Sequence, residues 1–215
     1  MTHRLVFVCE ANVCRSPLME LVLRAHTDDA HWHVSSAGAH AAPRGSRMCA
    51  LSATAAAVAG DAATPDLVDA HRATPLTAER VRAADLVLTA TRVERAAVAT
   101  MVPDARARAF TLREAVHLGA EPMDLAAPVR HAPDDEADGL ARYAAALHAR
   151  RGLAAAPHRG RGLLGRRRPH PFDTPDAHHG SVRGHRAMLA ATADDVQRFL
   201  RQASDFLASP AARGQ

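Results

Sequence analysis

The segment CEANVCRS, residues 9–16, holds two of the chain's three cysteines together with an arginine and a serine. Such a segment suits three kinds of chemistry: a metal site, a redox couple, or a nucleophile with its anion-binding loop. A zinc site usually needs two cysteines separated by about two to four residues, plus a second pair of ligands. Cys9 and Cys14 are five positions apart, and no second pair of cysteines or histidines with that spacing follows. The sequence therefore predicts no metal and no cofactor.

The nucleophile interpretation uses every residue of the segment. A loop that leaves a strand and opens a helix can turn its backbone N–H groups inward around an anion, and these dipoles favour the thiolate form of Cys9. Arg15 can hold two phosphate oxygens, Ser16 can donate a hydrogen bond to the thiolate, and Asn12 tolerates the left-handed backbone of a tight loop. The other expected members of this cradle are Glu10, Ala11, Val13 and Cys14.

Hydrophobic patterning predicts the elements that would hold this loop. Strands are expected at residues 4–8, 32–38, 84–90 and 107–112, and helices at 16–26, 46–60, 92–101 and 187–208. The first helix is expected to begin with Ser16 as its N-cap and Pro17 at its first position. This alternation predicts an α/β fold: a four-stranded parallel sheet flanked by helices on both faces, in three layers.

Composition narrows the class of protein. The chain has 215 residues, of which 47% are hydrophobic but only 3% aromatic, so its core must consist mostly of Ala, Val and Leu. Every basic residue is arginine, which together with the abundant alanine indicates a GC-rich bacterial source. Three cysteines are too few for a disulfide framework, and no stretch approaches the roughly 18 apolar residues of a membrane span. We expect a cytoplasmic protein with no membrane partner.

An arginine-rich segment interrupts the pattern. Residues 117–152 predict one long helix with a polar lead-in, and residues 153–171 predict a flexible loop. Seven arginines and no acidic residue occur from Arg150 to Arg168. They could neutralise nucleic-acid phosphates, but no aromatic side chain lies among them for base stacking, so we expect no nucleic-acid partner. The expected organisation is one α/β domain made of residues 1–115 and 172–209, an insertion at 116–171 and a disordered tail at 210–215.

The segment VCEANVCRSP, residues 8–17, resembles the phosphate-binding loop of the low-molecular-weight protein tyrosine phosphatases, which reads approximately V-C-x-G-N-I-C-R-S-P. It departs from the family at Ala11, where the family has glycine. SSAG (35–38) resembles the end of the family's second strand, where the resemblance implies that Ser36 braces the loop. HRATPLT (71–77) resembles a segment in which His71 supports the loop asparagine.

Two more segments resemble the family's third and fourth strands, namely ADLVLTATRVER (84–95), with Thr91 where the family usually has Asp, and RARAFTLREA (106–115). The resemblance runs over residues 4–115 and again from about 172 to 207. It implies a divergent bacterial member of the family that carries an arginine-rich insertion.

The family's proton donor is an aspartate in an Asp-Pro motif before the last helix, because the leaving oxygen of a phosphate ester needs a proton. This chain has no Asp-Pro, and FDTPDAHHG (172–180) is the nearest match. The resemblance aligns Asp176 with the acid and Ala177 with the proline. Asp173 and the acidic residues of 133–138 are alternative donors, and both aspartates could instead cap a turn.

The resemblance implies a phosphomonoester hydrolase, most simply a protein-tyrosine-phosphatase. Cys9 would attack phosphorus and form a phosphocysteine, Arg15 and the loop amides would hold the phosphate oxygens, and Asp176 would protonate the leaving group. The substrate would be a phosphotyrosine protein or another phosphomonoester. The family's aromatic side chains that frame the substrate are replaced by His40, His178 and His179, which makes substrate binding pH-sensitive.

Two alternatives remain at this point. Ala11 and Ala177 would suit a catalytically impaired relative that only binds phosphate or another anion. An arsenate reductase of the same fold would need further cysteines, and the only other cysteine is Cys49, in the expected helix 46–60. Cys14 is either a packing residue of the loop or a redox guard of Cys9. The sequence leaves the oligomeric state open.

Overall fold

The central strand of the fold is β1, His3–Cys9, which is covered on both of its faces. Side chains alternate along a strand, so Leu5, Phe7 and Cys9 pack into one hydrophobic cluster while Val6 and Val8 pack into another. The computed structural model that reveals this arrangement describes residues 2–40, 43, 45–120, 139–153, 169–178 and 180–209.

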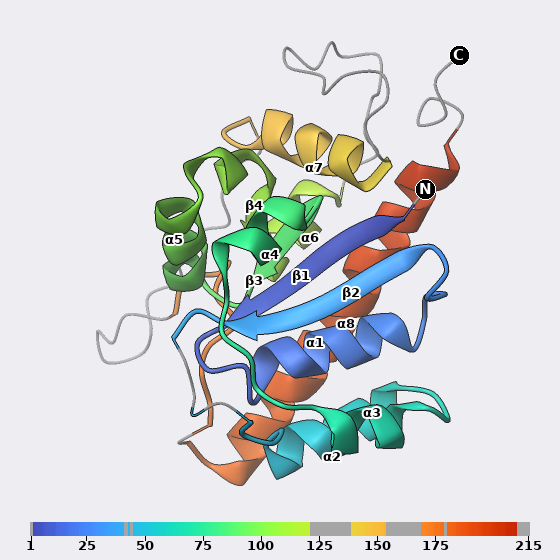
Figure 1. Cartoon of the computed structure of the whole chain (residues 1–215), viewed down its shortest axis with the longest axis vertical. Helices are drawn as coiled ribbons and strands as arrows, with labels where there is room; N and C mark the ends of the chain where they lie inside the picture. The colour runs from blue at the N-terminus through green and yellow to red at the C-terminus, as the bar shows by residue number, and fades with distance from the viewer. Residues whose placement is uncertain are drawn as a thin grey trace.

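The sheet has the order β2-β1-β3-β4, and all of its strands run parallel (Figure 1). The other strands are β2, Trp32–Gly38, β3, Leu86–Thr89, and β4, Ala109–Thr111. The sequence prediction of a four-stranded parallel α/β sheet is confirmed, although β3 and β4 are shorter than predicted. Because all strands are parallel, their carboxyl ends meet at one edge, where binding sites of open α/β sheets form.

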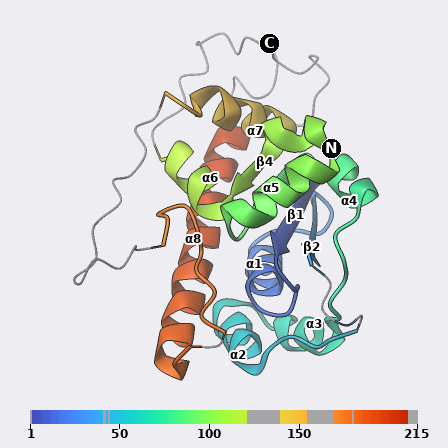
Figure 2. The same ribbon diagram turned by 90° about the vertical axis from the view of Figure 1, so that its left-hand side faces the viewer.

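Helices cover both faces of this sheet, and α8 and α4 lie on opposite sides of it (Figure 2). The larger hydrophobic cluster receives side chains from α1, Arg15–Arg24, α6, Leu112–Leu118, α7, Gly139–Arg150, and α8, Val182–Ala208. The smaller cluster receives them from α4, Ala78–Ala83, α5, Arg92–Met101, and the 3₁₀ helix η1, Pro103–Arg108. The remaining helices, α2 and α3, span Ala50–Ala59 and Thr64–Ala70.

The first and last helices differ from the predictions at their N-termini. Cys14, not Ser16, is the N-cap of α1, so the prediction of a Ser16 cap was wrong; the Ser16 hydroxyl is used in the loop instead. Helix α8 begins five residues before the predicted start at 187, because the side chain of Ser181 accepts a hydrogen bond from the backbone N–H of Gly184 and caps it.

The predicted helix over residues 117–152 overlaps two helices, α6 and α7, and residues 121–138 lie outside the described part of the chain. Helix α7 buries Leu140, Tyr143 and Leu147 in the same cluster as α8. Most of the predicted loop 153–171 and the tail 210–215 also lie outside the described residues. The division into one domain, an insertion and a tail therefore stays a prediction.

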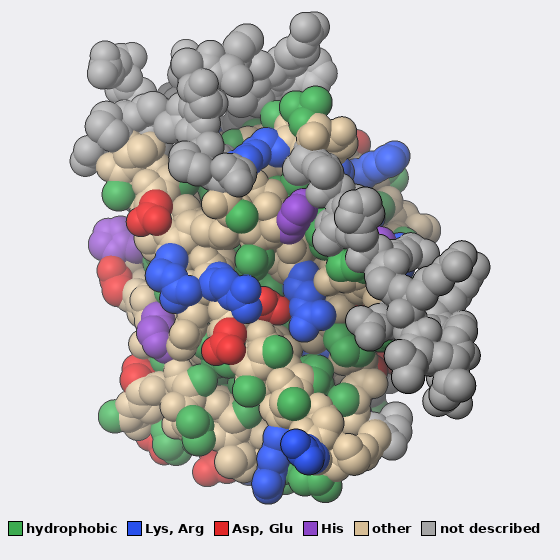
Figure 3. Space-filling view, turned by 180° about the vertical axis from the view of Figure 1, so that it is seen from behind, with side chains coloured by type: hydrophobic (Ala, Val, Ile, Leu, Met, Phe, Trp, Pro, Cys, Tyr) green, Lys and Arg blue, Asp and Glu red, His purple; other side chains and the backbone are tan. Residues whose placement is uncertain are grey.

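Positively and negatively charged side chains are interspersed on the surface of the described residues. On the face seen from behind, arginine, acidic and apolar side chains are interspersed (Figure 3). Ion pairs join Arg113 and Arg198 to Asp195. None of the described helices combines the length and the apolarity that crossing a membrane requires.

Candidate active site

The loop formed by residues 9–16, which we call the phosphate loop, joins the carboxyl end of β1 to α1 (Figure 1). Its carbonyl groups point outward: those of residues 9, 10, 12, 13 and 14 accept hydrogen bonds of 2.7–2.9 Å from outside the loop. The donors are the backbone of Ala39, His40 and Cys49 and the side chains of Ser52 and His71. Because the C=O and N–H of a trans peptide point in opposite directions, the following N–H groups face the loop interior, as an anion cradle requires.

The left-handed residue of the loop is Asn12. It has φ of 56°, and it is the one described residue other than glycine with a positive φ. Asparagine adopts this conformation more readily than most residues, which agrees with the role predicted for Asn12. The family's glycine position, Ala11, is not among the positive-φ residues. Alanine at this position therefore carries no left-handed backbone strain.

A buried hydrogen-bond chain runs from helix α1 to the thiol of Cys9. The Asn12 side-chain amide donates to Ser16 Oγ at 3.0 Å and to Ser36 Oγ at 2.8 Å. Ser36 in turn donates to Glu20 Oε2 at 2.6 Å, which leaves its oxygen to accept from Asn12. Ser16 accepts from Asn12 and lies 3.1 Å from the sulfur of Cys9. The single hydroxyl proton of Ser16 can go either to the carbonyl of Ala37, 3.4 Å from Ser16 Oγ, or to the sulfur of Cys9. Ser16 can therefore stabilise a Cys9 thiolate when its hydroxyl turns to the sulfur.

Glu20 ends this chain and was not predicted. Burial raises the pKa of Glu20, and the hydrogen bond from Ser36 opposes that shift. Glu20 lies one helical turn after Ser16 and faces the same side of α1. The i, i+4 spacing from Ser16 is the sequence signal that could have identified it.

Two further contacts hold the Asn12 side of the loop. His71 Nε2 donates to the backbone carbonyl of Asn12 at 2.9 Å, and the backbone N–H of Thr74 donates to the Asn12 side-chain oxygen at 2.9 Å. Arg80 donates to Thr74 Oγ1 at 3.1 Å and to the carbonyl of Ser36 at 3.2 Å. His71 therefore contacts the backbone of the loop asparagine, while Thr74 and Arg80 are contacts that sequence reasoning missed.

Gly38 allows β2 to approach the loop closely. A Cβ atom at this position would lie 2.9 Å from the backbone carbon of Ala11 and 3.0 Å from the carbonyl oxygen of Glu10. Backbone atoms cannot move aside as a flexible side chain can. Any residue larger than glycine would therefore displace the phosphate loop.

Arg15 is 3% exposed and points toward the segment that precedes α8. Its guanidinium donates to Asp176 Oδ2 at 2.9 Å and to the carbonyl of Thr174 at 3.2 Å. The carboxylate of Glu94 lies 3.9 Å away. The two predicted residues Arg15 and Asp176 are therefore in direct contact, although 161 positions separate them.

Asp173 has a different environment from Asp176. It accepts hydrogen bonds from the backbone N–H, Nε and NH2 of Arg92 at 2.9, 3.1 and 3.0 Å. Burial raises the pKa of Asp173, but the Arg92 hydrogen bonds outweigh it and hold the pKa below its usual value. Thr174 N–H also donates to the carbonyl of Ala90 at 2.8 Å. These bonds anchor the segment at Asp173, whereas Asp176 contacts Arg15 of the phosphate loop.

Cys14 lies outside the loop interior, against α2 and α8. Its sulfur is 3.1 Å from Nε2 of His185. A hydrogen bond with Cys49, together with burial, raises the pKa of the Cys14 thiol, and the same bond lowers the pKa of Cys49. The pair thus keeps a proton on Cys14, which disfavours Cys14 as a nucleophile.

Of the three histidines expected to frame the substrate, His40 and His178 lie in the described part of the chain. His40 is exposed and follows β2, with its backbone N–H on the carbonyl of Glu10. The backbone N–H of His178 donates to Asp176 Oδ1 at 2.9 Å. His179 and the acidic residues of 133–138 lie outside the described residues.

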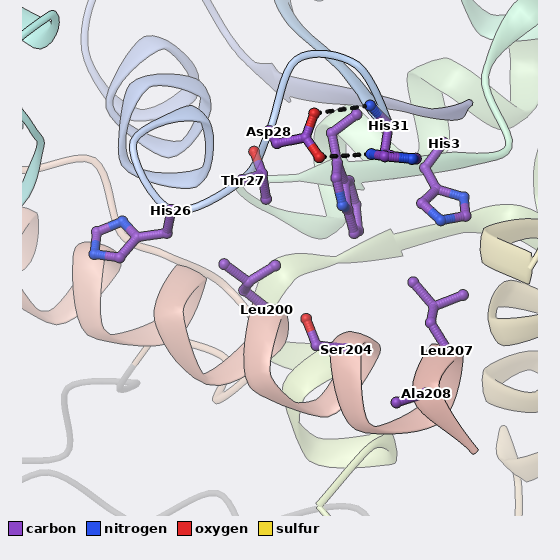
Figure 4. A pocket seen from close by; sticks show the side chains of 10 residues that line it. His3, His26, Thr27, Asp28, His31, Leu200, Ser204, Leu207 and Ala208 are labelled. Carbon is purple, nitrogen blue, oxygen red and sulfur yellow. Dashed lines mark hydrogen bonds and ion pairs between the residues drawn. The ribbon is translucent and has the colours of Figure 1, made fainter. Parts of the chain in front are cut away.

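A surface pocket of about 430 Å³ is shown in Figure 4, and none of its lining residues belongs to the phosphate loop. It is lined by His3 and Trp32, the first residues of β1 and β2, and by His31, which contacts Asp28. The strands are parallel, so this pocket lies at the edge of the sheet opposite the phosphate loop. It is therefore not part of the candidate active site.

Comparison with known proteins matches this chain to phosphatases. The family described as low molecular weight phosphotyrosine protein phosphatase matches residues 4–151. A protein-arginine-phosphatase of Bacillus subtilis (strain 168) is 32% identical over 123 residues, which cover 52% of this chain and 71% of that protein. A low molecular weight protein-tyrosine-phosphatase of Streptomyces coelicolor is 57% identical over 30 residues, 14% of this chain and 18% of that protein.

Solved structures agree on the fold. The arginine phosphatase from Geobacillus stearothermophilus has a TM-score of 0.60 and 20% identity, and the match covers 95% of both chains. A tyrosine phosphatase from Erwinia amylovora has a TM-score of 0.58 and 17% identity, over 94% of this chain and 93% of that chain. At such identities the likeness establishes the fold alone.

The parallel sheet with its cysteine-bearing loop after the first strand defines the class, an α/β phosphatase, and the protein is an enzyme. The family match extends over more than half of the chain. The chain belongs to the low molecular weight phosphotyrosine protein phosphatase family, as the sequence resemblance implied.

Proposed function

We propose that Cys9 is the nucleophile and that the protein hydrolyses phosphomonoesters of proteins, most simply phosphotyrosine, through a phosphocysteine. The observation that carries this proposal is the contact of Arg15 with Asp176 beside a loop whose N–H groups face inward. It brings a cation for the phosphate oxygens and a carboxyl group for the leaving oxygen next to one thiol.

In the first step, Cys9 sulfur attacks phosphorus, an S–P bond forms and the bond from phosphorus to the leaving oxygen breaks. Arg15 and the loop N–H groups bind the equatorial oxygens as charge redistributes. Asp176 gives its proton to the leaving oxygen. In the second step, Asp176 takes a proton from water, the water oxygen attacks phosphorus, and the S–P bond breaks to release phosphate and the thiolate.

Phosphoarginine is a second candidate substrate, because the relative that this chain matches over 71% of its length is named a protein-arginine-phosphatase. Cleavage would then break a P–N bond, and Asp176 would protonate nitrogen instead of oxygen. The catalytic residues would be the same. Only the groups around the entrance, such as His40, would distinguish the two side chains.

The test compares the full-length wild type with Cys9→Ser on three substrates: p-nitrophenyl phosphate, a phosphotyrosine peptide and a phosphoarginine peptide. We expect turnover in the wild type, none in Cys9→Ser, and a higher kcat/KM on the phosphotyrosine peptide. A higher kcat/KM on the phosphoarginine peptide would select the second candidate. Equal rates in the two proteins would reject catalysis by Cys9 and favour anion binding at this loop. Arsenate reduction by the wild type would select the reductase alternative.

The remaining expectations follow from this assignment. The partner would be a phosphorylated protein, reached in a reducing cytoplasm, because all three cysteines are free thiols. We expect neither a nucleic acid nor a membrane as partner. A bacterial source agrees with the use of arginine, and no lysine, for the basic residues of the chain.

A further inference from the structure

We propose that Cys14, Cys49, His178 and His185 form a zinc site that fastens the acid-bearing segment to the phosphate loop. One ligand atom from each of these residues lies within 4.8 Å of all the others. The sequence predicts no metal because it lacks two pairs of Cys or His residues in which the members of each pair are only a few positions apart. The fold instead brings together four residues that are far apart in the chain.

The four atoms suit Zn²⁺ in number and in type. Two sulfurs and two imidazole nitrogens are a usual tetrahedral set for structural zinc, whereas Mg²⁺ and Ca²⁺ prefer oxygen. With ordinary Zn–S and Zn–N bond lengths, tetrahedral ligand atoms lie about 3.3–3.8 Å apart. Cys14 Sγ and His185 Nε2 are already 3.1 Å apart, and the widest separation needs to close by at most about 1.5 Å.

The backbone positions of the ligands also favour a bound cation with two thiolates. Cys49 is the N-cap of α2, where the helix dipole favours a negative sulfur. Cys14 is the N-cap of α1 and would release its proton when it binds the metal. His185 is buried in the first turn of α8, and its ring contacts the ring of His178 with centroids 5.4 Å apart. His178 is exposed, so solvent can reach the site and deliver the metal.

Binding would couple the metal to the active site without placing it on the nucleophile. Each thiol that binds Zn²⁺ releases its proton to solvent, and no electron moves. His178 lies two residues after Asp176, so a bond to His178 would restrict the position of the acid. A Zn²⁺-bound Cys14 could not form a disulfide with Cys9. The site goes beyond the proposed hydrolysis, because it requires Cys14 and Cys49 but not Cys9.

The direct test measures metal binding in the full chain. Protein is stripped with a chelator under reducing conditions, titrated with Zn²⁺, and assayed for zinc by mass spectrometry of the metal. We expect one zinc per chain in the wild type, and a loss of affinity of more than about 100-fold in Cys49→Ser and in His178→Asn, because even outer-shell changes cost 10–100-fold. Co²⁺ in place of Zn²⁺ should give the intense sulfur-to-metal and visible bands of a tetrahedral thiolate site.

Two matched substitutions serve as controls. Cys9→Ser removes a thiol from the same loop, and His33→Asn removes an exposed imidazole from β2; both should keep one zinc. His178 is exposed, so His178→Asn stays folded even where a change at buried His185 does not. Zinc lost in Cys9→Ser would move the metal to the catalytic loop and overturn the proposal.

Hydrogen exchange gives a readout that does not depend on catalysis. Zn²⁺ should slow exchange in the peptide that contains Asp176 and His178 in the wild type and in Cys9→Ser, but not in Cys49→Ser. A Cys14–Cys49 disulfide in the wild type, found by mass spectrometry together with failure to bind zinc after reduction, would assign the pair to redox chemistry and overturn the proposal. Cys9→Ser lacks the proposed nucleophile but keeps all four proposed zinc ligands. A failure of the zinc proposal can therefore be distinguished from a failure of the proposed catalysis by Cys9.

Discussion

The guanidinium of Arg15 donates a hydrogen bond of 2.9 Å to the carboxylate of Asp176. This contact joins the loop after β1 to the segment before α8. The other aspartate of that segment, Asp173, is bound to Arg92 instead. Substitution of the two aspartates should therefore have different effects.

Asp176→Asn should lower kcat on phenyl phosphate by about 10²–10⁴-fold, the usual contribution of a general acid. The loss should be smaller on p-nitrophenyl phosphate, whose leaving group needs less help from a proton. Steady-state kinetics on both esters measures the difference. Asp29→Asn, at an exposed aspartate that pairs with Arg24, is the matched control and should leave kcat unchanged. Equal losses on the two esters would indicate a positioning role for Asp176.

Asp173→Asn should destabilise the protein at neutral pH by about 1–2 kcal/mol, since hydrogen bonds to a charged group are stronger than neutral ones but Arg92 is partly exposed. The folded-state pKa of Asp173 is below its ordinary value of about 3.9. Its stabilisation is therefore present above that value and is lost as the pH falls through the folded-state pKa. Urea unfolding of both proteins at pH 7 and at strongly acidic pH checks this. An equal difference at the two pH values would show that ionisation of Asp173 is not the cause.

Asn12 combines a backbone role and a side-chain role, which two substitutions separate. Asn12→Gly keeps the left-handed backbone but removes the bonds to Ser16 and Ser36, so kcat/KM should fall by about tenfold or more, the equivalent of about 1.4 kcal/mol. Asn12→Ala should lose similar activity and a further ~1 kcal/mol of folding stability, because alanine is strained at positive φ. Kinetics and urea unfolding of the two variants test this. Full activity in Asn12→Gly would show that the amide bonds do not support the nucleophile.

Gly38→Ala should reduce activity more than stability, because the added Cβ would meet the backbone of the phosphate loop. We expect kcat/KM to fall by at least about tenfold, since small displacements of a catalytic group are costly. Gly139→Ala is the control: its Cβ would meet the end of the Leu207 side chain, at the start of α7. That variant should keep its kcat/KM. A Gly38→Ala enzyme with wild-type kcat/KM would contradict the close approach of β2.

The fold could be predicted from the sequence because β1 and β3 contain continuous apolar runs, residues 5–8 and 86–88. The short helices α3 and α4 were missed, since six or seven residues give too little periodicity to detect. The N-cap of α1 was misplaced because Ser16 is a good capping residue in general. In this fold its hydroxyl faces Cys9 and Asn12 instead.

Much of the candidate site was predicted because its residues lie close together in one segment. Residues of other elements that hydrogen-bond to the phosphate loop were predicted only where they belong to a recognisable motif, as Ser36 and His71 do. Glu20, Gly38 and Thr74 act through contacts that depend on how β2 and α1 pack. A short stretch of sequence does not indicate how two elements pack against each other. The same limit applies to Cys49, whose neighbour Cys14 is 35 positions away.

The outward carbonyls of the phosphate loop have a consequence for the order of folding. Their donors come from residues 39–71, and the partner of Arg15 comes from residue 176. The carbonyl side of the phosphate loop is thus held by contacts of high sequence separation, which we expect to form late because distant parts of the chain must first meet. During refolding, the regain of activity should lag behind the regain of helical signal. The rate of phosphate release would then report on the final closure of the chain, while circular dichroism reports on its earlier local steps.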